Sequence, residues 1–374
     1  MQIKKHNVYE TLARHLSCLS MGIPFKKGIG DILRENLTEN EAAAALILPA
    51  TVIPLKVTSI DALDPPDGMP RSEMKRHLKN LSDKGMVVSA ETDDGSIGYA
   101  LLHVGFGFPQ TFFWKGEDTP HARKMAKMVA KYFNPKMSRE IHDTDPKAYR
   151  YIPVGKTVQN TPQGVLPFNM MEKVIEDTQV IALGHCPCRM GFILAGRGCD
   201  HPTEVCMKFN DMARFVIDKG FAREITKTEA LEVIKLAEEK GLVHFVDNAE
   251  GEIQHCCNCC GCACWNVGAI RRRSIPRDML MATYFIRAMD ADECIECGAC
   301  ADICPVDAVA MSADDVPETD TEWCIGCGVC ATVCPTDAIT MVYREDKQQG
   351  LPAKTFGDLH ELISTYRKKK DKPE

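Results

Sequence analysis

The stretch Cys294-Ile-Glu-Cys297-Gly-Ala-Cys300-Ala-Asp-Ile-Cys304-Pro305 recurs thirty residues later as Cys324-Ile-Gly-Cys327-Gly-Val-Cys330-Ala-Thr-Val-Cys334-Pro335. Both copies have the spacing C-x₂-C-x₂-C-x₃-C-P, which holds [4Fe–4S] cubanes, and the fourth cysteine of each run binds the cluster of the other run. We therefore predict one cluster held by Cys294, Cys297, Cys300 and Cys334, and a second held by Cys324, Cys327, Cys330 and Cys304. Zinc sites or a disulfide scaffold fit less well, because the third cysteine step and the following proline are repeated too.

The composition is that of an ordinary globular protein with an unusual number of thiols. The chain has 374 residues, of which 19 are cysteine, 45% are hydrophobic and 26% are charged. This length predicts two or three domains. The formal net charge of −7 argues against a general nucleic-acid-binding function, because such proteins are normally basic.

The N-terminus bears on the compartment and on the state of the cysteines. It begins Met-Gln-Ile-Lys-Lys-His, without the apolar stretch of a secretory signal, and the chain has no run of eighteen apolar residues. We therefore expect no membrane span and a cytoplasmic protein with thiols or metal thiolates rather than disulfides. An anaerobic source is expected, because iron–sulfur clusters are vulnerable to oxygen.

Residues 1–110 show helices followed by a hairpin. Helices are predicted where Val8, Leu12, Leu16 and Leu19 share one face, and over 39–48 and 72–84. Strands at 86–90 and 97–102 flank an Asp-Asp-Gly turn. This order is typical of a winged-helix domain.

A winged helix raises the question of DNA binding. The helix over 72–84 and its flanks carry basic side chains sufficient for phosphate contacts: Arg71, Lys75, Arg76, Lys79 and Lys84. The hairpin is acidic, with Glu91, Asp93 and Asp94, and would repel phosphate. We therefore expect a structural or docking domain and no nucleic-acid partner.

The rest of the chain divides into four parts. Residues 111–180 form a proline-rich connecting region, and 181–270 a cysteine-rich, helical, metal-binding segment. Residues 283–345 contain the cysteine repeat, with matching strands predicted at 309–311 and 339–343. Residues 346–374 form a helix and tail. The predicted fold class is therefore α+β, with no catalytic residue indicated.

Ten further cysteines lie in the middle segment in two groups: Cys186, Cys188, Cys199 and Cys206, followed by Cys256, Cys257, Cys259, Cys260, Cys262 and Cys264. The first group suffices for one [4Fe–4S] cluster or one tetrahedral zinc ion. The second is predicted to form a tight loop with turn residues Asn258 and Gly261. A further cluster, a zinc ion and redox-active dithiols remain alternatives for it, as does one site shared by both groups. His201, His244 and His255 are candidate extra ligands.

The repeat near the C-terminus resembles a bacterial two-cluster ferredoxin. The order of the whole chain is similar to multidomain 4Fe–4S ferredoxin-type proteins of anaerobes. The segments that carry this second resemblance are Cys186-Pro187-Cys188-Arg189 and Cys256-Cys257-Asn258-Cys259-Cys260-Gly261-Cys262. The resemblance implies redox work beside larger oxidoreductases.

These observations predict an electron-transfer protein that relays single electrons through two or more [4Fe–4S] clusters. The partner would be a larger oxidoreductase or electron-transfer subunit. Ile295, Val306, Ile325 and Val333 are expected to shield the clusters. Two alternatives stay open: a reductase with a catalytic cluster in 181–270, and a redox-sensing winged-helix regulator. A carrier or redox subunit is favoured over a stand-alone enzyme.

Overall fold

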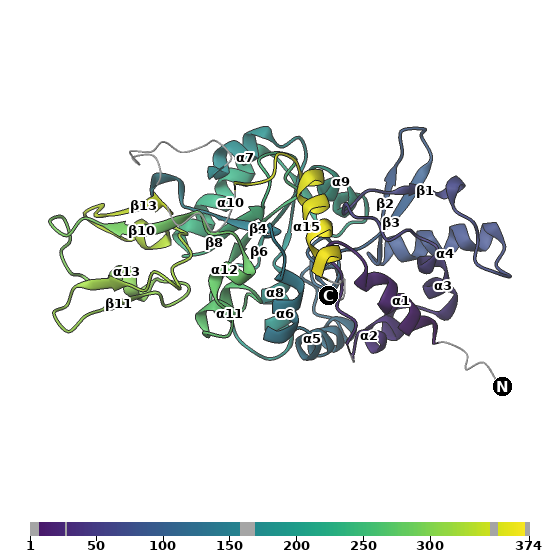
Figure 1. The fold of residues 1–374 in the computed structure, drawn as a ribbon, viewed down its shortest axis with the longest axis horizontal. Helices are drawn as coiled ribbons and strands as arrows, with labels where there is room; N and C mark the ends of the chain where they lie inside the picture. Colours follow the sequence, from purple (N-terminus) through teal and green to yellow (C-terminus); the bar gives the residue numbers. More distant parts are fainter. Residues whose placement is uncertain (1–6, 27, 158–168, 345–350, 371–374) are drawn as a thin grey trace.

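The computed structural model describes residues 7–26, 28–157, 169–344 and 351–370. Figure 1 shows the N-terminal segment at one end, a central sheet with its helices in the middle, and the cysteine repeat at the other end. Helices and strands are mixed along the whole chain. Among the described residues, none of the helices has the length and apolar character needed to cross a membrane.

The N-terminal segment combines four helices with a small sheet. The helices are α1 (Val8–Ser17), α2 (Ile29–Asn36), α3 (Glu39–Leu46) and α4 (Arg71–Asp83). Strands β1 (Thr58–Ser59), β2 (Val87–Glu91) and β3 (Ile97–Leu101) form an antiparallel sheet in the order β1-β3-β2. A capping box between Thr38 and Glu41 fixes the start of α3. The predicted helices and hairpin are present; the winged-helix assignment itself stays a prediction.

The centre of the molecule is a six-stranded antiparallel sheet in the order β4-β8-β9-β6-β5-β7. Its strands are β4 (Tyr149–Ile152), β5 (Ile181–His185), β6 (Glu204–Phe209), β7 (Arg223–Ile225), β8 (Val243–Asp247) and β9 (His255–Cys259). The prediction of a helical segment over 181–270 was therefore wrong. Five of the six strands lie there, together with helices. The sheet was missed because its strands are short and buried on both faces, so polar and apolar residues do not alternate.

Helices cover both sides of this sheet. In Figure 1, α7 (Met171–Asp177), α9 (Asn210–Asp218) and α10 (Lys227–Glu239) lie above it. Below it lie α5 (Pro120–Tyr132), α6 (Pro135–His142), α8 (Pro187–Leu194), α11 (Val267–Arg271) and α12 (Arg277–Leu280). The capping box Thr226–Glu229 starts α10. The short 3-10 turns η1 (Ile60–Ala62), η2 (Gln110–Phe112) and η3 (Gly155–Thr157) complete the described elements up to the repeat.

The cysteine repeat forms two similar halves. Each run leads into one helical turn, α13 (Ala299–Asp302) or α14 (Val329–Thr332). The predicted strands are present as β11 (Val309–Met311) and β13 (Ile339–Tyr343), which pair with β12 (Pro317–Thr319) and β10 (Phe285–Met289). Three equivalent pairs of positions have a left-handed backbone: Glu296 and Gly326, Gly298 and Gly328, Asp307 and Asp337. The repeat in sequence is therefore also a repeat in backbone conformation.

The C-terminal helix α15 (Phe356–Lys370) returns to the middle of the molecule, away from the repeat (Figure 1). Its buried His360 Nδ1 lies 3.1 Å from Ser20 Oγ, and Ser20 Oγ in turn lies 3.3 Å from His103 Nδ1. Arg367 donates to the carbonyl of Ile141 over 2.7 Å. The helix therefore ties the N-terminal segment to the central one.

Candidate metal centres

Alternation along the central strands gathers cysteines on one face of the sheet. In β9, His255, Cys257 and Cys259 point to one face, and Cys256 and Asn258 point to the other. β6 pairs with β9 through Lys208 opposite His255 and Met207 opposite Cys256, so the next position of this register sets Cys206 opposite Cys257. Directly opposed residues of antiparallel strands have Cβ atoms about 5 Å apart. Two cysteines distant in sequence therefore meet on the sheet.

Six thiols surround a buried cavity above this face. They are Cys186, Cys188, Cys206, Cys257, Cys259 and Cys264, and all six line the same cavity. Interactions between neighbouring thiols run from Cys186 through Cys188, Cys264, Cys259 and Cys257 to Cys206, and Cys206 in turn interacts with Cys186. This closed ring, hereafter the six-thiol site, offers the ligand type of iron–sulfur clusters, because such clusters are held by cysteine thiolates.

Buried cations offset the negative charge that thiolates would bring into this site. Although burial alone would lower it, the pKa of Lys208 is raised by Cys206 and Cys257. Burial likewise opposes the charge on His255, but Asp247 and Cys257 raise the pKa of His255 to about 9. Cationic Lys208 and His255 side chains would compensate the charge of an anionic cluster bound here.

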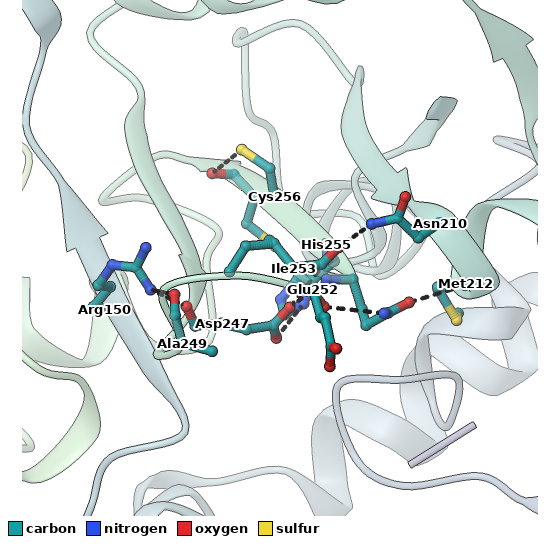
Figure 2. Close-up of polar contacts among 11 residues, drawn as sticks. Arg150, Asn210, Met212, Asp247, Ala249, Glu252, Ile253, His255 and Cys256 are labelled. Carbon is teal, nitrogen blue, oxygen red and sulfur yellow. Dashed lines mark hydrogen bonds and ion pairs between the residues drawn. The ribbon is translucent and has the colours of Figure 1, made fainter. Parts of the chain in front are cut away.

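Figure 2 shows how Asp247 holds His255 in place. Asp247 Oδ1 lies 3.0 Å from His255 Nδ1, and Asp247 Oδ2 accepts from the backbone N–H of Gln254 over 2.7 Å. Asp247 is fully buried, so its charge needs these partners. The same network fixes the start of β9 and thus the direction in which Cys257 and Cys259 point.

A second, compact group lies beyond the end of β9. Cys199, His201, Cys260 and Cys262 each place one ligand atom within 4.8 Å of all the others. The Sγ atom of Cys199 lies 3.1 Å from that of Cys262 and 3.8 Å from that of Cys260. His201 Nδ1 lies 3.6 Å from Cys199 Sγ and 3.7 Å from Cys262 Sγ.

The structure therefore divides the ten middle cysteines differently from their order in the sequence. Cys199 lies with Cys260 and Cys262 rather than with Cys186, Cys188 and Cys206. Cys256, labelled in Figure 2, is fully buried, on the face opposite to Cys257.

The prediction of a tight loop with Asn258 as a turn residue was wrong. It lies within β9 rather than in a turn, and its side-chain amide donates to the carbonyl of Val205 over 2.7 Å. Because β9 is a strand, adjacent cysteines within it point to opposite faces of the sheet and lie among different residues.

Arg189 stands between the two middle groups. Its side chain is fully buried, its Nε donates to Cys260 Sγ over 3.5 Å, and its terminal nitrogens donate to the carbonyls of Pro202 and Asn258. The Arg189 charge also interacts with Cys186 of the six-thiol site. His185, directly before Cys186 in the sequence, contacts Thr203 Oγ1 over 3.2 Å.

In the cysteine repeat, the first predicted ligand set lines one cavity. Cys294, Cys297, Cys300 and Cys334 all border it, although Cys334 belongs to the second run. Arg287 Nη2 donates to Cys300 Sγ over 3.7 Å. Hydrogen bonds from charged donors to cluster sulfurs are a recognised means of setting reduction potential.

The second predicted set is gathered in the same way. Cys324, Cys327 and Cys330 interact electrostatically with one another and with Cys304 of the first run. Burial and the neighbouring thiolates raise the pKa of Cys330 to about 12. The backbone N–H of Ala308 donates to Cys304 Sγ over 3.2 Å. Both quartets thus fit cubanes with exchanged fourth ligands.

The two quartets differ in exposure. Cys304, Cys324, Cys327 and Cys330 are all buried, whereas Cys297 is exposed and Cys294 and Cys334 are partly exposed. Val306 and Ile325 are buried as expected, but Ile295 was wrongly expected to be a shield, because it is 60% exposed. The quartet around Cys297 therefore lies at the surface, and the quartet around Cys327 lies inward.

Tyr151, in β4, lies near thiols of both the inner quartet and the six-thiol site. Its side chain is fully buried, and burial together with the nearby thiols of Cys264, Cys259 and Cys327 raises the pKa of its hydroxyl. The hydroxyl has no hydrogen-bond partner among the described residues. The backbone N–H of Val154 donates to the carbonyl of Cys327 over 3.0 Å. Strand β4 and the segment after it are therefore near both cysteine centres.

These centres define an iron–sulfur protein with a ferredoxin-type domain at its C-terminal end. Two family models, each described as a 4Fe-4S dicluster domain, match residues 288–341 and residues 323–365. The recognition of a ferredoxin-type 4Fe–4S domain in this part of the chain is thereby confirmed. No curated protein and no solved structure matches the chain.

Proposed function

We propose that this protein relays single electrons between an external redox partner and the six-thiol site through two [4Fe–4S] clusters. The observation that supports the proposal is that Cys334 borders one cavity with the cysteines of the first run and that Cys304 interacts with those of the second, as an exchange of the fourth ligands would require. Bound clusters would supply one-electron oxidation and reduction. The chain's own residues bind them, bury them and balance their charge.

The gradient of exposure supports an order of the centres along the relay. The quartet around Cys297 is partly exposed, the quartet around Cys327 is buried, and Tyr151 lies near Cys327 as well as near Cys259 and Cys264 of the six-thiol site. Electrons would enter at the surface and move inward, or leave in the reverse order. The six-thiol site would hold a third cluster, and the two ligand quartets would be those predicted from the sequence.

The surface beside Cys297 provides a face for the partner. Ile295 is 60% exposed there and is accompanied by exposed carboxylates of Asp290, Asp292, Glu293 and Glu296. An apolar centre with an acidic rim suits a partner with a basic surface. A larger oxidoreductase with such a surface is the proposed partner.

The N-terminal segment would serve as a structural or docking domain, and ion pairs support this over DNA binding. Each basic side chain expected on α4 or beside it lies within 4.0 Å of a carboxylate oxygen: Arg71 with Asp64, Lys75 with Asp61, Arg76 with Glu73, Lys79 with Asp83 and Lys84 with Glu41. Their charge is therefore largely compensated, which weakens attraction to phosphate. The many thiolate sites favour a reducing compartment, so a cytoplasmic location and an anaerobic source remain part of the proposal.

The first experiment is a count of iron, sulfide and zinc on anaerobically purified protein. We expect about eight iron atoms from the two cubanes and at least about four more from the six-thiol site. Adjacent cysteines give a matched pair of variants. Cys257→Ala should lower iron below the wild-type value, whereas Cys256→Ala should leave iron unchanged, because Cys256 points to the other face. Iron that stops at about eight, or equal iron in both variants, would remove the third cluster from the proposal.

A second candidate function, a reductase, is favoured by a cavity next to the six-thiol site. This outer cavity has a volume of about 390 Å³ and is bordered by Arg197 and Arg272. The stacked rings of Phe133 and Trp265, with centroids 5.3 Å apart, border both this cavity and the one lined by the six thiols. A small anionic substrate could therefore approach the thiols past one aromatic pair.

Cyanide is a probe that distinguishes the two functions. A reductase needs an iron that an external ligand can reach, so cyanide should change the electron paramagnetic resonance spectrum of the reduced protein. Trp265→Ala should speed that change, and Trp323→Ala, in the C-terminal domain, should leave its rate unaltered. A spectrum unaffected by cyanide would support the carrier alone.

A further inference from the structure

We propose that Cys199, His201, Cys260 and Cys262 form a site for a single zinc ion, separate from the iron–sulfur centres. The relay described above does not need this ion, and the evidence for it is independent of the cluster sites. It comes from the distances among four ligand atoms contributed by two loops, one after α8 and one after β9.

The distances are near those of tetrahedral coordination, except that Cys262 Sγ lies closer to the other two sulfurs. With zinc–sulfur bonds of about 2.3 Å and a zinc–nitrogen bond of about 2.1 Å, a tetrahedron places sulfurs about 3.8 Å apart and sulfur and nitrogen about 3.6 Å apart. The three sulfur–sulfur distances are 3.1, 3.2 and 3.8 Å. The two sulfur–nitrogen distances to His201 Nδ1 are 3.6 and 3.7 Å. Three thiolates and one imidazole are a known ligand set of structural zinc sites.

The same distances disfavour a cubane at this place. Each thiolate of a cubane binds a different iron on the outside of the cluster, so its four ligands lie further apart than those of one ion. Here the three sulfurs lie no further apart than the ligands of one shared ion. The nearby Arg189, which donates to Cys260 Sγ, would offset the net charge of three thiolates around one divalent ion.

The ion would brace the contact between the central segment and the ferredoxin-type domain. Gly261, between two of the ligands, packs so closely on Pro305 that a Cβ atom at this position would overlap the Pro305 carbonyl oxygen. Two residues after Pro305, Asp307 Oδ2 accepts a hydrogen bond from Arg271 Nε over 2.9 Å. A metal ion that holds the turn at Gly261 would therefore also hold the surface against which Pro305 packs.

Zinc X-ray absorption on the intact wild-type protein tests the ligand set without any variant. We expect a first shell of three sulfurs at about 2.3 Å and one nitrogen at about 2.0–2.1 Å. A shell of four sulfurs would overturn the role of His201, and protein without zinc would overturn the site.

Two cysteine variants separate this site from the iron centres. Cys262→Ser should remove most of the zinc, about one ion per chain, while iron and sulfide stay at wild-type values. Cys256→Ser, at a buried cysteine outside both groups, should keep both metals. Amide hydrogen exchange at residues 304–307 should become faster in Cys262→Ser only. Loss of iron in place of zinc in Cys262→Ser would assign these thiols to a cluster and end the proposal, whereas a wrong relay would show as low iron with this zinc retained.

Discussion

Glu296 and Gly326 occupy equivalent positions in the two cysteine runs, and both have a left-handed backbone, with φ of 59° and 62°. Their surroundings differ. Glu296 is exposed, whereas a Cβ atom at Gly326 would overlap the carbonyl oxygen of Phe285 in β10. The inner half of the repeat is therefore packed against the rest of the domain at a point where the outer half is open.

This difference predicts that an alanine will have unequal effects at the two positions. Gly326→Ala should cost about 3 kcal/mol or more, because the new Cβ atom adds overlap to an unfavourable φ. We expect about four fewer iron atoms per chain, from loss of the cluster held by the inner quartet. Glu296→Ala has the same backbone angle without the overlap and should keep its iron. Metal analysis of the two variants makes the comparison, and equal iron in both would contradict it.

Replacement of a predicted ligand tests the outer cluster. Cys297→Ala should lower iron by about four atoms per chain and remove one paramagnetic centre from the spectrum of the reduced protein. Cys18→Ala is the control, because Cys18 is exposed on the N-terminal segment and should leave the metal content unchanged. Full iron retention in Cys297→Ala would refute the assigned ligand set.

The buried hydroxyl of Tyr151 predicts a shift in reduction potential. It has no hydrogen-bond partner among the described residues, thiols included, and lies near cysteines of both neighbouring centres, so we expect it to donate to a sulfide of a bound cluster. A hydrogen bond of about 1 kcal/mol corresponds to about 40 mV for a one-electron couple. Tyr151→Phe should therefore lower one midpoint potential by roughly this amount in a potentiometric titration.

The control for this shift is Tyr9→Phe. Tyr9 is also buried, but its hydroxyl donates to the carbonyl of Leu37 in the N-terminal segment. This variant should lose some stability and leave every potential unaltered. Unchanged potentials in Tyr151→Phe would show that its hydroxyl does not reach a cluster sulfide.

Buried histidines predict a loss of stability in acid. Burial lowers the pKa of His103, His142 and His360 to about 3, below the value of about 6.5 for an unfolded chain. The unfolded state binds more protons between these values, so each histidine contributes stability above pH 6.5 that is lost as the pH falls toward 3. The slope is at most about 1.4 kcal/mol per pH unit for each histidine.

His360→Gln should weaken this pH dependence. Between pH 7 and pH 5 we expect the variant to lose up to about 2 kcal/mol less stability than the wild type, seen as a smaller fall in the thermal midpoint under anaerobic conditions. His121→Gln, at an exposed position on α5, is the control. An equal fall in the thermal midpoint of the wild type and of His360→Gln would show that His360 does not titrate on unfolding.

Local signals explain which parts of the fold could be predicted. The capping box at Thr226 and the hairpin turn within Asp93–Gly95 depend on a few adjacent residues, and the corresponding elements are present. The repeated cysteine spacing likewise fixed where β11 and β13 begin, because each cluster run imposes the same backbone on the residues after it. Lys208 was missed as part of a site, although its position two residues after Cys206 in a strand could have indicated it.

The sequence by itself determined the ferredoxin-type domain, since its ligands lie within one short repeat whose spacing matches the metal chemistry. The number of thiols available for further centres was also set by the sequence. Only the tertiary structure decided how those thiols are shared. Cys199 and Cys262 are 63 residues apart in the chain, yet their sulfurs lie 3.1 Å apart, while adjacent Cys256 and Cys257 point to opposite faces of β9. Strand alternation and long-range pairing set these relationships, and neither is encoded in the spacing of the cysteines.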